Sequence, residues 1–326
     1  MKAVGLFSGG LDSLLAIKLI QKQGIDVTTI SFSSPFFINK EKKKKLEETA
    51  RKNKFKIKFI EFGYDYLKLV RNPPHGYGKN MNPCIDCHAF MLKKAKQYAN
   101  KIGAKFVFTG EVLDERPMSQ NRKSLEIVAS EAGLKGKLLR PLSAKLLQET
   151  EAEKKNWVDR DKLMGLRGRS RKPQFELAKK FGIKEYETPG GGCLLTYPEY
   201  SKKLKDLFEH KKKVSLNDAR LLRAGRHFRH GKNKIIVGRN EEDNKQLLKL
   251  KEKKDLKFEV KSYMGPITLL QGKADKKIVK LAASLTARYS DADIDKIKVK
   301  YGKDKFNKEL TVTPIKEREI EQLRIK

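Results

Sequence analysis

The sequence predicts an α/β fold with a parallel β-sheet, followed by a smaller, basic α+β region. In the first 110 residues, short runs rich in β-branched and aromatic residues alternate with longer amphipathic stretches. Such alternation is typical of parallel strands joined by crossover helices. Beyond about residue 200, short lysine-rich helical stretches mix with β-like runs. A length of 326 residues accommodates two domains, and we expect them over residues 1–205 and 206–326.

The N-terminal elements can be placed in order. The first strand is expected over Lys2–Phe7, and Gly24 ends the helix that follows it. The next expected elements are a strand over Val27–Phe32, a helix over Lys40–Asn53, a strand over Lys56–Glu61, a helix over Ala89–Ile102, a strand over Lys105–Thr109 and a helix over Lys172–Phe181. A long connection rich in Gly, Pro and Asn precedes the Ala89 helix, and loops of this kind are commonly functional.

The C-terminal elements are shorter. They are helices over Lys202–His210 and Asp243–Lys254, and β-like runs over Lys234–Val237, Lys257–Val260 and Ile267–Gln271.

The strongest compositional signal is charge. The chain has 74 Lys and Arg against 40 Asp and Glu, a net charge of +34. Such a surplus opposes compaction unless a polyanion shares the surface, which predicts a nucleic-acid partner. No stretch approaches the ~20 apolar residues of a membrane span, and the start MKAVGLFSGG lacks the features of a signal peptide. The three cysteines are too few for a disulfide scaffold, so we expect a cytoplasmic protein.

The glycine turn after the first strand indicates a phosphate site. Ser8-Gly-Gly-Leu-Asp-Ser13 lies between a strand and a helix, where backbone N–H groups and the helix N-terminus can bind an anion. The Ser13 hydroxyl can donate to it, and Asp12 can help to hold Mg²⁺ or cap the helix. The loop has neither the P-loop nor the dinucleotide-binding pattern. The structural alternative is an ordinary strand-to-helix turn.

The three cysteines lie in two separate segments. Cys84 and Cys87 form a C-x-x-C, and Cys193 follows a glycine run at residues 190–192. Three thiolates suit an iron–sulfur cluster with one open iron, or a relay in which one cysteine carries a persulfide that another resolves. A zinc site would need a fourth ligand. The candidates for it are His75, His88 and the aspartates. Because both segments are rich in Gly and Pro, we expect them in loops rather than in a core.

These motifs resemble known families. The Ser8–Ser13 loop resembles the PP-loop of ATP pyrophosphatases, which adenylate a carbonyl oxygen with ATP and release pyrophosphate. Five further segments are similar to those of tRNA uridine thiolation enzymes of the ThiI and MnmA type. They are Asn82-Pro-Cys-Ile-Asp-Cys87, Thr109-Gly-Glu-Val112, Arg116-Pro-Met-Ser-Gln120, Arg140-Pro-Leu142 and Pro189-Gly-Gly-Gly-Cys193. The likeness covers roughly residues 1–200.

The resemblance implies specific roles. The ATP-binding residues would be Ser8, Gly9, Gly10, Asp12, Ser13 and Gly110, with Mg²⁺ as the metal. The catalytic residues would be Cys84, Cys87 and Cys193, which would also be the ligands of a [4Fe-4S] cluster. Cys84 stands where MnmA-type enzymes with a persulfide mechanism have an aspartate, and this departure favours the cluster over the relay. Further candidates for contact with nucleotide, phosphate or substrate are Glu111, Arg116, Gln120 and Arg122.

A run of cations interrupted by Phe228 begins the C-terminal region. Each phosphate that Lys or Arg neutralises releases counterions and adds salt-sensitive affinity. The candidate RNA-binding residues are Arg223, Arg226, Arg229, Lys232 and Arg239. The run Ile235–Asn240 with Asp243–Asn244 resembles the opening of the RNA-binding domain of NFACT proteins. This resemblance implies that the C-terminal region docks tRNA.

The sequence therefore predicts an ATP-dependent tRNA sulfurtransferase. It would adenylate a uridine carbonyl and replace the oxygen with sulfur, giving 2-thio- or 4-thiouridine. The expected partners are tRNA, a sulfur donor (a cysteine desulfurase, a carrier protein or sulfide) and, as a candidate assembly, a second copy in a homodimer. Two alternatives stay open: a PP-loop ligase or amidating enzyme with another acceptor, and a non-enzymatic RNA-binding factor.

Overall fold

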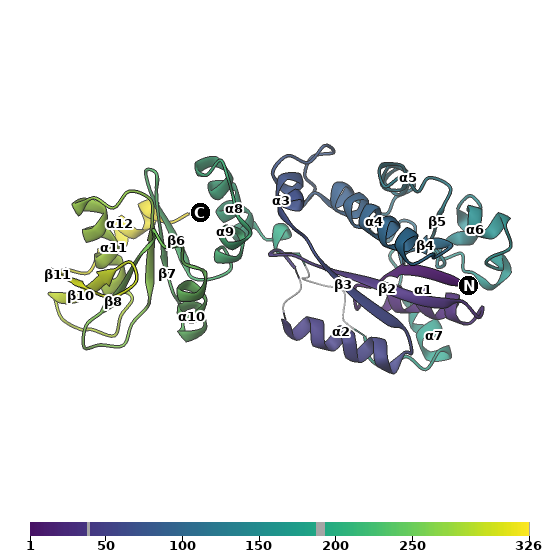
Figure 1. Cartoon of the computed structure of the whole chain (residues 1–326), viewed down its shortest axis with the longest axis horizontal. Coiled ribbons are helices and arrows are strands. Elements are labelled where there is room, and N and C mark those ends of the chain that lie inside the picture. Colours follow the sequence, from purple (N-terminus) through teal and green to yellow (C-terminus); the bar gives the residue numbers. More distant parts are fainter. Residues whose placement is uncertain (38–39, 187–192, 326) are drawn as a thin grey trace. The chain divides into compact units, whose positions relative to one another are not determined.

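The computed structural model describes residues 1–37, 40–186 and 193–325, in two compact units, Met1–Leu194 and Leu195–Lys326 (Figure 1). The boundary expected from the sequence lies later, after residue 205. Residues from Leu195 onward join the second unit because helix α8 (Pro198–His210) is bonded within it. The Tyr200 hydroxyl donates to the Ala219 carbonyl at 3.2 Å, and Arg229 donates to the Asp206 carboxylate.

The first unit is built on a parallel sheet of five strands in the order β3-β2-β1-β4-β5. The strands are β1 (Lys2–Leu6), β2 (Asp26–Ser33), β3 (Lys56–Glu61), β4 (Phe106–Phe108) and β5 (Leu138–Leu139). The chain builds outward from β1 to β3 and then returns to the other side of β1 for β4. Ligands of open α/β sheets bind at such a switch point, beyond the carboxyl ends of the strands. The Ser8–Ser13 loop follows β1 at this point.

Helices cover both faces of this sheet. They are α1 (Leu11–Gln21), α2 (Lys40–Lys52), α3 (Tyr64–Arg71), α4 (Cys84–Lys101), α5 (Arg122–Glu131), α6 (Glu151–Lys154) and α7 (Lys172–Lys180). Figure 1 shows α4 and α5 on one face and α2 and α7 on the other. Helix α1 is buried almost all round, because it lies between the sheet and α7. The predicted α/β fold with a parallel sheet is confirmed.

Two expectations for the connection before β4 are wrong. Helix α3 lies inside the segment expected to be loop, and α4 begins at Cys84 instead of Ala89. The C-x-x-C therefore occupies the first turn of a helix. Pro83 at the N-cap position and Asp86 in the first turn favour this start, because an acidic side chain there complements the helix dipole. Cys87 is consequently buried, whereas the sequence predicted a loop position.

The second unit has an antiparallel sheet of six strands in the order β11-β10-β8-β9-β7-β6. The strands are β6 (Arg226–His230), β7 (Asn233–Val237), β8 (Leu256–Val260), β9 (Thr268–Gln271), β10 (Ile297–Gly302) and β11 (Lys308–Val312). The helices besides α8 are α9 (Leu216–Leu221), α10 (Glu241–Leu250), α11 (Lys276–Arg288) and α12 (Glu317–Leu323). Helix α11 packs its Ile278 and Leu285 into a core with Phe228 and Phe258. The expected α+β character is confirmed. Throughout the described chain, helices with the length and apolar character needed to cross a membrane are absent.

Candidate active site

The Ser8–Ser13 loop folds back on itself at the N-terminus of α1. The Ser13 hydroxyl donates to the Gly10 carbonyl at 2.8 Å, and the Gly10 N–H donates to Ser8 Oγ at 3.3 Å. Gly9 has a φ of 90°, which favours glycine. Gly10 is the N-cap residue and provides no side-chain cap, so of the two roles considered for Asp12 the capping alternative is wrong. The first N–H groups of α1 have no side-chain acceptor at this cap, as an anion-binding helix start requires.

Gly110 lies directly against this loop, just beyond the end of β4. A Cβ atom at position 110 would lie 2.6 Å from the carbonyl carbon and oxygen of Asp12 and from the Cα of Ser13. These are backbone atoms and cannot move aside. Glycine is therefore required where β4 meets the start of α1, and the structure places the sixth predicted ATP-binding residue beside the other five.

Four charged side chains surround the start of α1. Arg171 donates to both oxygens of Asp12 at 3.3 and 3.5 Å, and its Nε lies 3.9 Å from Glu115 Oε1. Burial raises the pKa of Asp12, and the charges of Arg171 and Arg116 oppose this rise. Burial, followed by the charge of Asp12, raises the pKa of Glu115. The sequence singled out neither Arg171 nor Glu115, because Arg171 lies 159 positions from its partner.

The thiols gather around a second group, at the N-terminus of α4. The Tyr66 hydroxyl and the Cys87 thiol lie 3.0 Å apart, and Tyr66 is 1% exposed. Burial raises the pKa of the Cys87 thiol to about 12, with Cys193 and Cys84 adding to the rise. Burial also raises the pKa of Tyr66 well above its usual value, and all three cysteines contribute. The structure thus brings the three predicted cysteines within electrostatic range of one tyrosine.

The remote cysteine reaches this group through the loop after β2. The Leu194 N–H donates to the Phe36 carbonyl at 3.0 Å, which fixes the residue next to Cys193. The Phe36 ring lies 6.1 Å from the Tyr66 ring, and the rings of Phe62 and Phe90 lie 4.5 and 5.5 Å from it. Tyr66, the partner of Cys87, is therefore surrounded by aromatic side chains. The preceding part of its motif, residues 189–192, lies outside the described residues.

Arg116 connects the two groups. Its positive charge opposes the rise in the pKa of Asp12 in the Ser8–Ser13 loop, and it also opposes the rise that burial causes in the pKa of the Cys84 thiol. Cys84 is only half-buried and has a further side-chain hydrogen bond with Asn82. One exposed arginine therefore acts on both a carboxylate of the glycine loop and a thiol of the C-x-x-C. The glycine loop and the C-x-x-C thus both lie within the electrostatic range of one side chain.

Both candidate histidine ligands are paired with carboxylates. His75 Nδ1 lies 2.7 Å from Asp86, and the His75 N–H donates to the same carboxylate at 3.1 Å. His88 Nδ1 lies 3.0 Å from Glu111, which also accepts from Arg140 Nε at 2.9 Å. Burial alone would raise the pKa of Glu111, but Arg140 and His88 outweigh it and hold the pKa at about 2. These pairs fasten the ends of α4 and β4 beside the thiols.

The described ranges contain no three His, Cys, Asp or Glu side chains around a point that could hold a metal ion. This absence applies both to the zinc ligand sets and to Cys84, Cys87 and Cys193, which all lie in the described ranges. Three thiols are the donor type that binds iron–sulfur clusters, but these three do not converge on one point as they are placed here.

The other polar candidates differ in what they contact. Gln120 is buried, and its Oε1 has no hydrogen-bond partner. Arg122 donates to the Leu146 carbonyl at 3.0 Å. Between Gln120 and Arg122, it is therefore Gln120 that has a buried polar atom without a partner, to which a bound molecule can form a hydrogen bond.

In the second unit the five cationic candidates fall into two groups. Arg229 donates to Asp206 at 2.8 and 2.6 Å, and Arg239 donates to Asp243 at 2.6 Å. Arg226 stacks 4.5 Å from the centre of the Tyr289 ring. Arg223 and Lys232 are exposed, and within the described residues neither side chain has a hydrogen bond or ion pair. The exposed pair fits phosphate contact best, because its charge is not already compensated.

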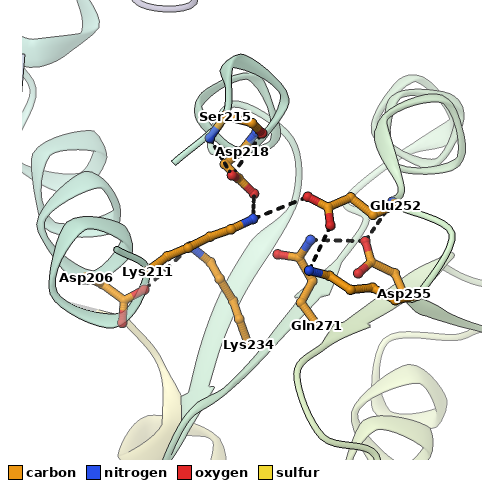
Figure 2. Close-up of polar contacts among 9 residues, drawn as sticks. Asp206, Lys211, Ser215, Asp218, Lys234, Glu252, Asp255 and Gln271 are labelled. Atoms are coloured by element: carbon orange, nitrogen blue, oxygen red, sulfur yellow. Dashed lines mark hydrogen bonds and ion pairs between the residues drawn. The ribbon is translucent and has the colours of Figure 1, made fainter. Parts of the chain in front are cut away.

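Several further charged side chains of this unit form ion pairs and hydrogen bonds with one another. Figure 2 shows Lys211 bridging Asp218 and Glu252, at 2.7 and 3.2 Å, while Asp255 accepts from Gln271 at 3.0 Å. The unit has 35 Lys and Arg against 19 Asp and Glu in residues 195–326, so internal pairing leaves a surplus of cations for the surface.

The motif at residues 235–244 serves the fold of this unit. Asn240 caps α10 by accepting from the Asp243 N–H at 2.9 Å, and Asn244 accepts from the Ile267 N–H at 2.9 Å. Asp243 also accepts from the Gly225 N–H at 3.0 Å. These side chains join the hairpin of β6 and β7 to the loop before β9.

Comparison with known proteins separates the chain in the same way. Residues 1–150 match the family model described as thiamine biosynthesis protein (ThiI), and residues 225–324 match the NFACT protein RNA binding domain. Both resemblances are confirmed. The chain has a ThiI-like first unit and an NFACT-like second unit.

Individual relatives match over parts of their length. A probable tRNA sulfurtransferase of Methanothermobacter thermautotrophicus is 30% identical over 148 residues, which cover 43% of this chain and 36% of the relative. The uncharacterized protein MJ1638 of Methanocaldococcus jannaschii is 31% identical over 112 residues, 34% of this chain and 41% of that protein. The chain thus spans less than half the length of these curated relatives.

Among solved structures, a 4-thiouridine synthetase–RNA complex with bound ATP aligns with 21% identity and a TM-score of 0.36. The alignment covers 68% of this chain and 52% of that one.

Proposed function

We propose that this protein is an ATP-dependent tRNA sulfurtransferase that adenylates a uridine carbonyl and replaces its oxygen with sulfur. The observation that carries the proposal is the Ser8–Ser13 loop packed against Gly110, in one unit with a C-x-x-C in the first turn of α4. An activating nucleotide and a sulfur nucleophile must meet at one carbon atom, and this arrangement allows it. The ThiI match and the probable tRNA sulfurtransferases among the relatives support the same reaction.

In the first step the ThiI-like unit binds ATP with Mg²⁺. The N–H groups at the start of α1 and the hydroxyls of Ser8 and Ser13 bind its phosphates. The Asp12 carboxylate is a suitable ligand for Mg²⁺, which prefers oxygen donors. The uridine carbonyl oxygen attacks the α-phosphorus, and the bond to the pyrophosphate breaks. AMP on the uridine then becomes the leaving group that an unmodified carbonyl oxygen cannot be.

In the second step a sulfur nucleophile attacks the activated carbon, and the carbon–oxygen bond breaks with release of AMP. Cys84 is the half-buried thiol beside Arg116, so it is the one best placed to present sulfur. Cys87 is buried, and burial raises the pKa of its thiol to about 12 against the opposing hydrogen bond to Tyr66, so this thiol stays protonated. The aromatic rings around Tyr66 make the surroundings of Cys87 apolar, which suits a step from which water must be excluded.

We further propose that Cys84, Cys87 and Cys193 bind a [4Fe-4S] cluster. When bound, such a cluster would supply an open iron that can carry the sulfur. As a ligand Cys87 would be a thiolate, and it would then accept a hydrogen bond from the Tyr66 hydroxyl. A persulfide relay between the same residues is the alternative. Anaerobic purification distinguishes the two: the cluster predicts a brown protein with about four irons per chain, and the relay a colourless one.

The NFACT-like unit provides the contact to tRNA in this proposal. Arg223 and Lys232 are exposed cations at the start of this unit and are available to backbone phosphates. The protein would work in the cytoplasm, with sulfur from a cysteine desulfurase, a carrier protein or sulfide. Whether one copy or a homodimer binds each tRNA is settled by the mass of the complex.

The proposal is tested with purified protein, Mg–ATP, bulk tRNA and sulfide, followed by mass spectrometry of the nucleosides. We expect thiouridine and pyrophosphate with the natural chain, and neither with Asp12→Asn. Cys193→Ala should abolish thiouridine formation. A variant with all three cysteines changed to serine should release at most one pyrophosphate per bound tRNA, because the adenylate is not consumed. Release of pyrophosphate over many turnovers by this variant would favour a ligase with another acceptor. No pyrophosphate release by the natural chain would favour a non-enzymatic RNA-binding factor.

A further inference from the structure

The first unit contains buried polar atoms without partners, and one of the residues that carry them contacts the glycine loop. In the described part of the first unit, such side-chain atoms belong to three residues: Gln120, Arg171 and Gln174. Buried polar groups in folded proteins are normally hydrogen-bonded, because an unpaired one is costly. Atoms of this kind therefore indicate where a bound molecule, or a rearrangement caused by one, supplies the missing bonds.

Gln174 is the most extreme case. It is 1% exposed, and both its amide nitrogen and its amide oxygen lack a partner. It lies on α7, three positions after Arg171, so the two side chains are neighbours on one helix face. Helical side chains lean toward the N-terminus of their helix, which directs Gln174 toward Arg171. The same helix face packs against α1, because Leu177 and Ala178 belong to the core that includes Leu14 and Ile17.

Arg171 connects this helix to the phosphate site. Its guanidinium reaches Asp12 at 3.3 Å, and its Nε is buried without a hydrogen bond. The loop Ser8–Ser13 contains no cation of its own, unlike a P-loop with its lysine. A triphosphate bound there needs positive charge from elsewhere, and Arg171 is the guanidinium in direct contact with the loop.

We propose that Arg171 binds the pyrophosphate portion of ATP and that Gln174 is its positioning residue. This inference rests on the proposed function. It adds residues at the start of α7 to the nucleotide site of that function. When Mg–ATP binds, the Asp12 carboxylate turns to the metal and releases the Arg171 guanidinium to the β- and γ-phosphate oxygens. The Gln174 amide oxygen then accepts from Arg171 Nε, which pairs two atoms that lack partners in the free protein.

The test is calorimetric titration of the full chain with Mg–ATP, AMP and inorganic pyrophosphate. Arg171→Ala should weaken Mg–ATP and pyrophosphate about tenfold to a hundredfold, as expected when charge-assisted hydrogen bonds are removed. The affinity for AMP should change by less than about threefold, because AMP lacks the two outer phosphates. Arg171→Lys keeps the charge and should recover part of the loss. The matched control is Arg169→Ala, an exposed arginine two positions away, which should leave all three affinities unchanged.

Gln174 is tested by the same titrations. Gln174→Ala should weaken Mg–ATP about threefold to tenfold, and Gln174→Glu, which keeps an acceptor oxygen, should restore it. Should Arg171→Ala fail to fold in a thermal unfolding scan, Arg171→Lys and Gln174→Ala carry the test. Unchanged Mg–ATP affinity in Arg171→Ala, or an equal loss for AMP and ATP, would overturn the inference.

The result is separable from that of the proposed function. Mg–ATP binding that depends on Arg171, in a protein that forms no thiouridine, would support this inference and contradict the sulfurtransferase. A natural chain that does not bind Mg–ATP would contradict both.

Discussion

The phosphate side and the thiol side of the proposed site are built from opposite kinds of residue. Around the start of α1, charged groups face one another: Asp12, Glu115, Arg116 and Arg171. Around the start of α4, the thiols meet Tyr66 and a set of phenylalanine rings. The first group suits a polyanion and its metal, and the second suits a soft nucleophile that must be kept from water.

In the proposed function, this contrast would let each of the two chemical steps use a different side of the site. Interactions between charged groups weaken when water raises the local dielectric constant, and water also hydrolyses an adenylate. Exclusion of water would therefore favour both steps. Arg116 is the residue that acts on both sides. Variants on one side should therefore leave the function of the other intact, and the following predictions use this separation.

The largest separation is expected for Cys193→Ser. It removes a thiol and leaves the residues of the Ser8–Ser13 loop unchanged, so thiouridine formation should fall by about a hundredfold or more. The affinity for Mg–ATP should stay within about twofold of the natural chain, as measured by calorimetry. A matched loss of ATP binding would show that the two sides are not separate.

Glu111 follows β4 and is paired with His88 of α4 and with Arg140, so it should contribute to stability. Glu111→Gln leaves Arg140 buried without its carboxylate, so the free energy of unfolding should fall by about 3 kcal/mol. Urea denaturation at pH 7 measures this, with Glu126→Gln on the exposed side of α5 as the control. An equal, small change in both variants would contradict the structural role of Glu111.

The same carboxylate predicts a pH dependence. Its folded pKa of about 2 lies below the ordinary value of 4.5, so the stabilisation is complete above about pH 5 and is lost as the pH falls toward 2. The loss should be about 3 kcal/mol across this range. In Glu111→Gln this component should be missing, so the fall in unfolding free energy between pH 5 and pH 3 should be smaller than in the natural chain.

A smaller effect is expected on the thiol side for Tyr66→Phe. It removes one buried hydrogen bond and keeps the ring, so the cost should be about 1 kcal/mol of unfolding free energy. Thiouridine formation should drop several-fold, whereas Mg–ATP affinity should not change. Tyr77→Phe is the control, because the Tyr77 hydroxyl donates to the Val70 and Arg71 carbonyls instead of a thiol. Identical behaviour of the two variants would refute the assignment.

The smallest effects are expected in the NFACT-like unit. Replacing Arg223 and Lys232 by alanine should lower tRNA affinity a few-fold and reduce the slope of log K against log salt by about 1 for each phosphate that the variant no longer neutralises. Arg229→Ala should instead lower the stability of the unit, because Arg229 is bonded to Asp206. Filter binding at several salt concentrations, beside thermal unfolding, separates the two outcomes.

The sequence predicted the parts of the fold that depend on local signals. The strand, glycine turn and helix around Ser8–Ser13 and the alternation that follows are local, and the structure has them at the expected places. The start of α4 at Cys84 was missed, because Pro83 reads as part of a loop while it also fits a helix start.

The charged and aromatic surroundings of the site could not be predicted from local signals in the sequence. Arg171 belongs to an arginine-rich stretch that looks solvated, and its partner Asp12 is brought to it only by the packing of α7 on α1. Tyr66 lies in a segment predicted to be loop, and its relation to Cys87 appears only when α3 and α4 form. Long-range pairs of this kind leave no periodic pattern in the sequence.

The central claim is that thiols from two distant segments meet at one site. Mild oxidation of the full chain, followed by peptide mass spectrometry, tests it most directly. The account predicts an intramolecular disulfide joining Cys193 to Cys84 or Cys87. Recovery of Cys193 as a free thiol, while Cys84 and Cys87 oxidise with each other, would contradict it.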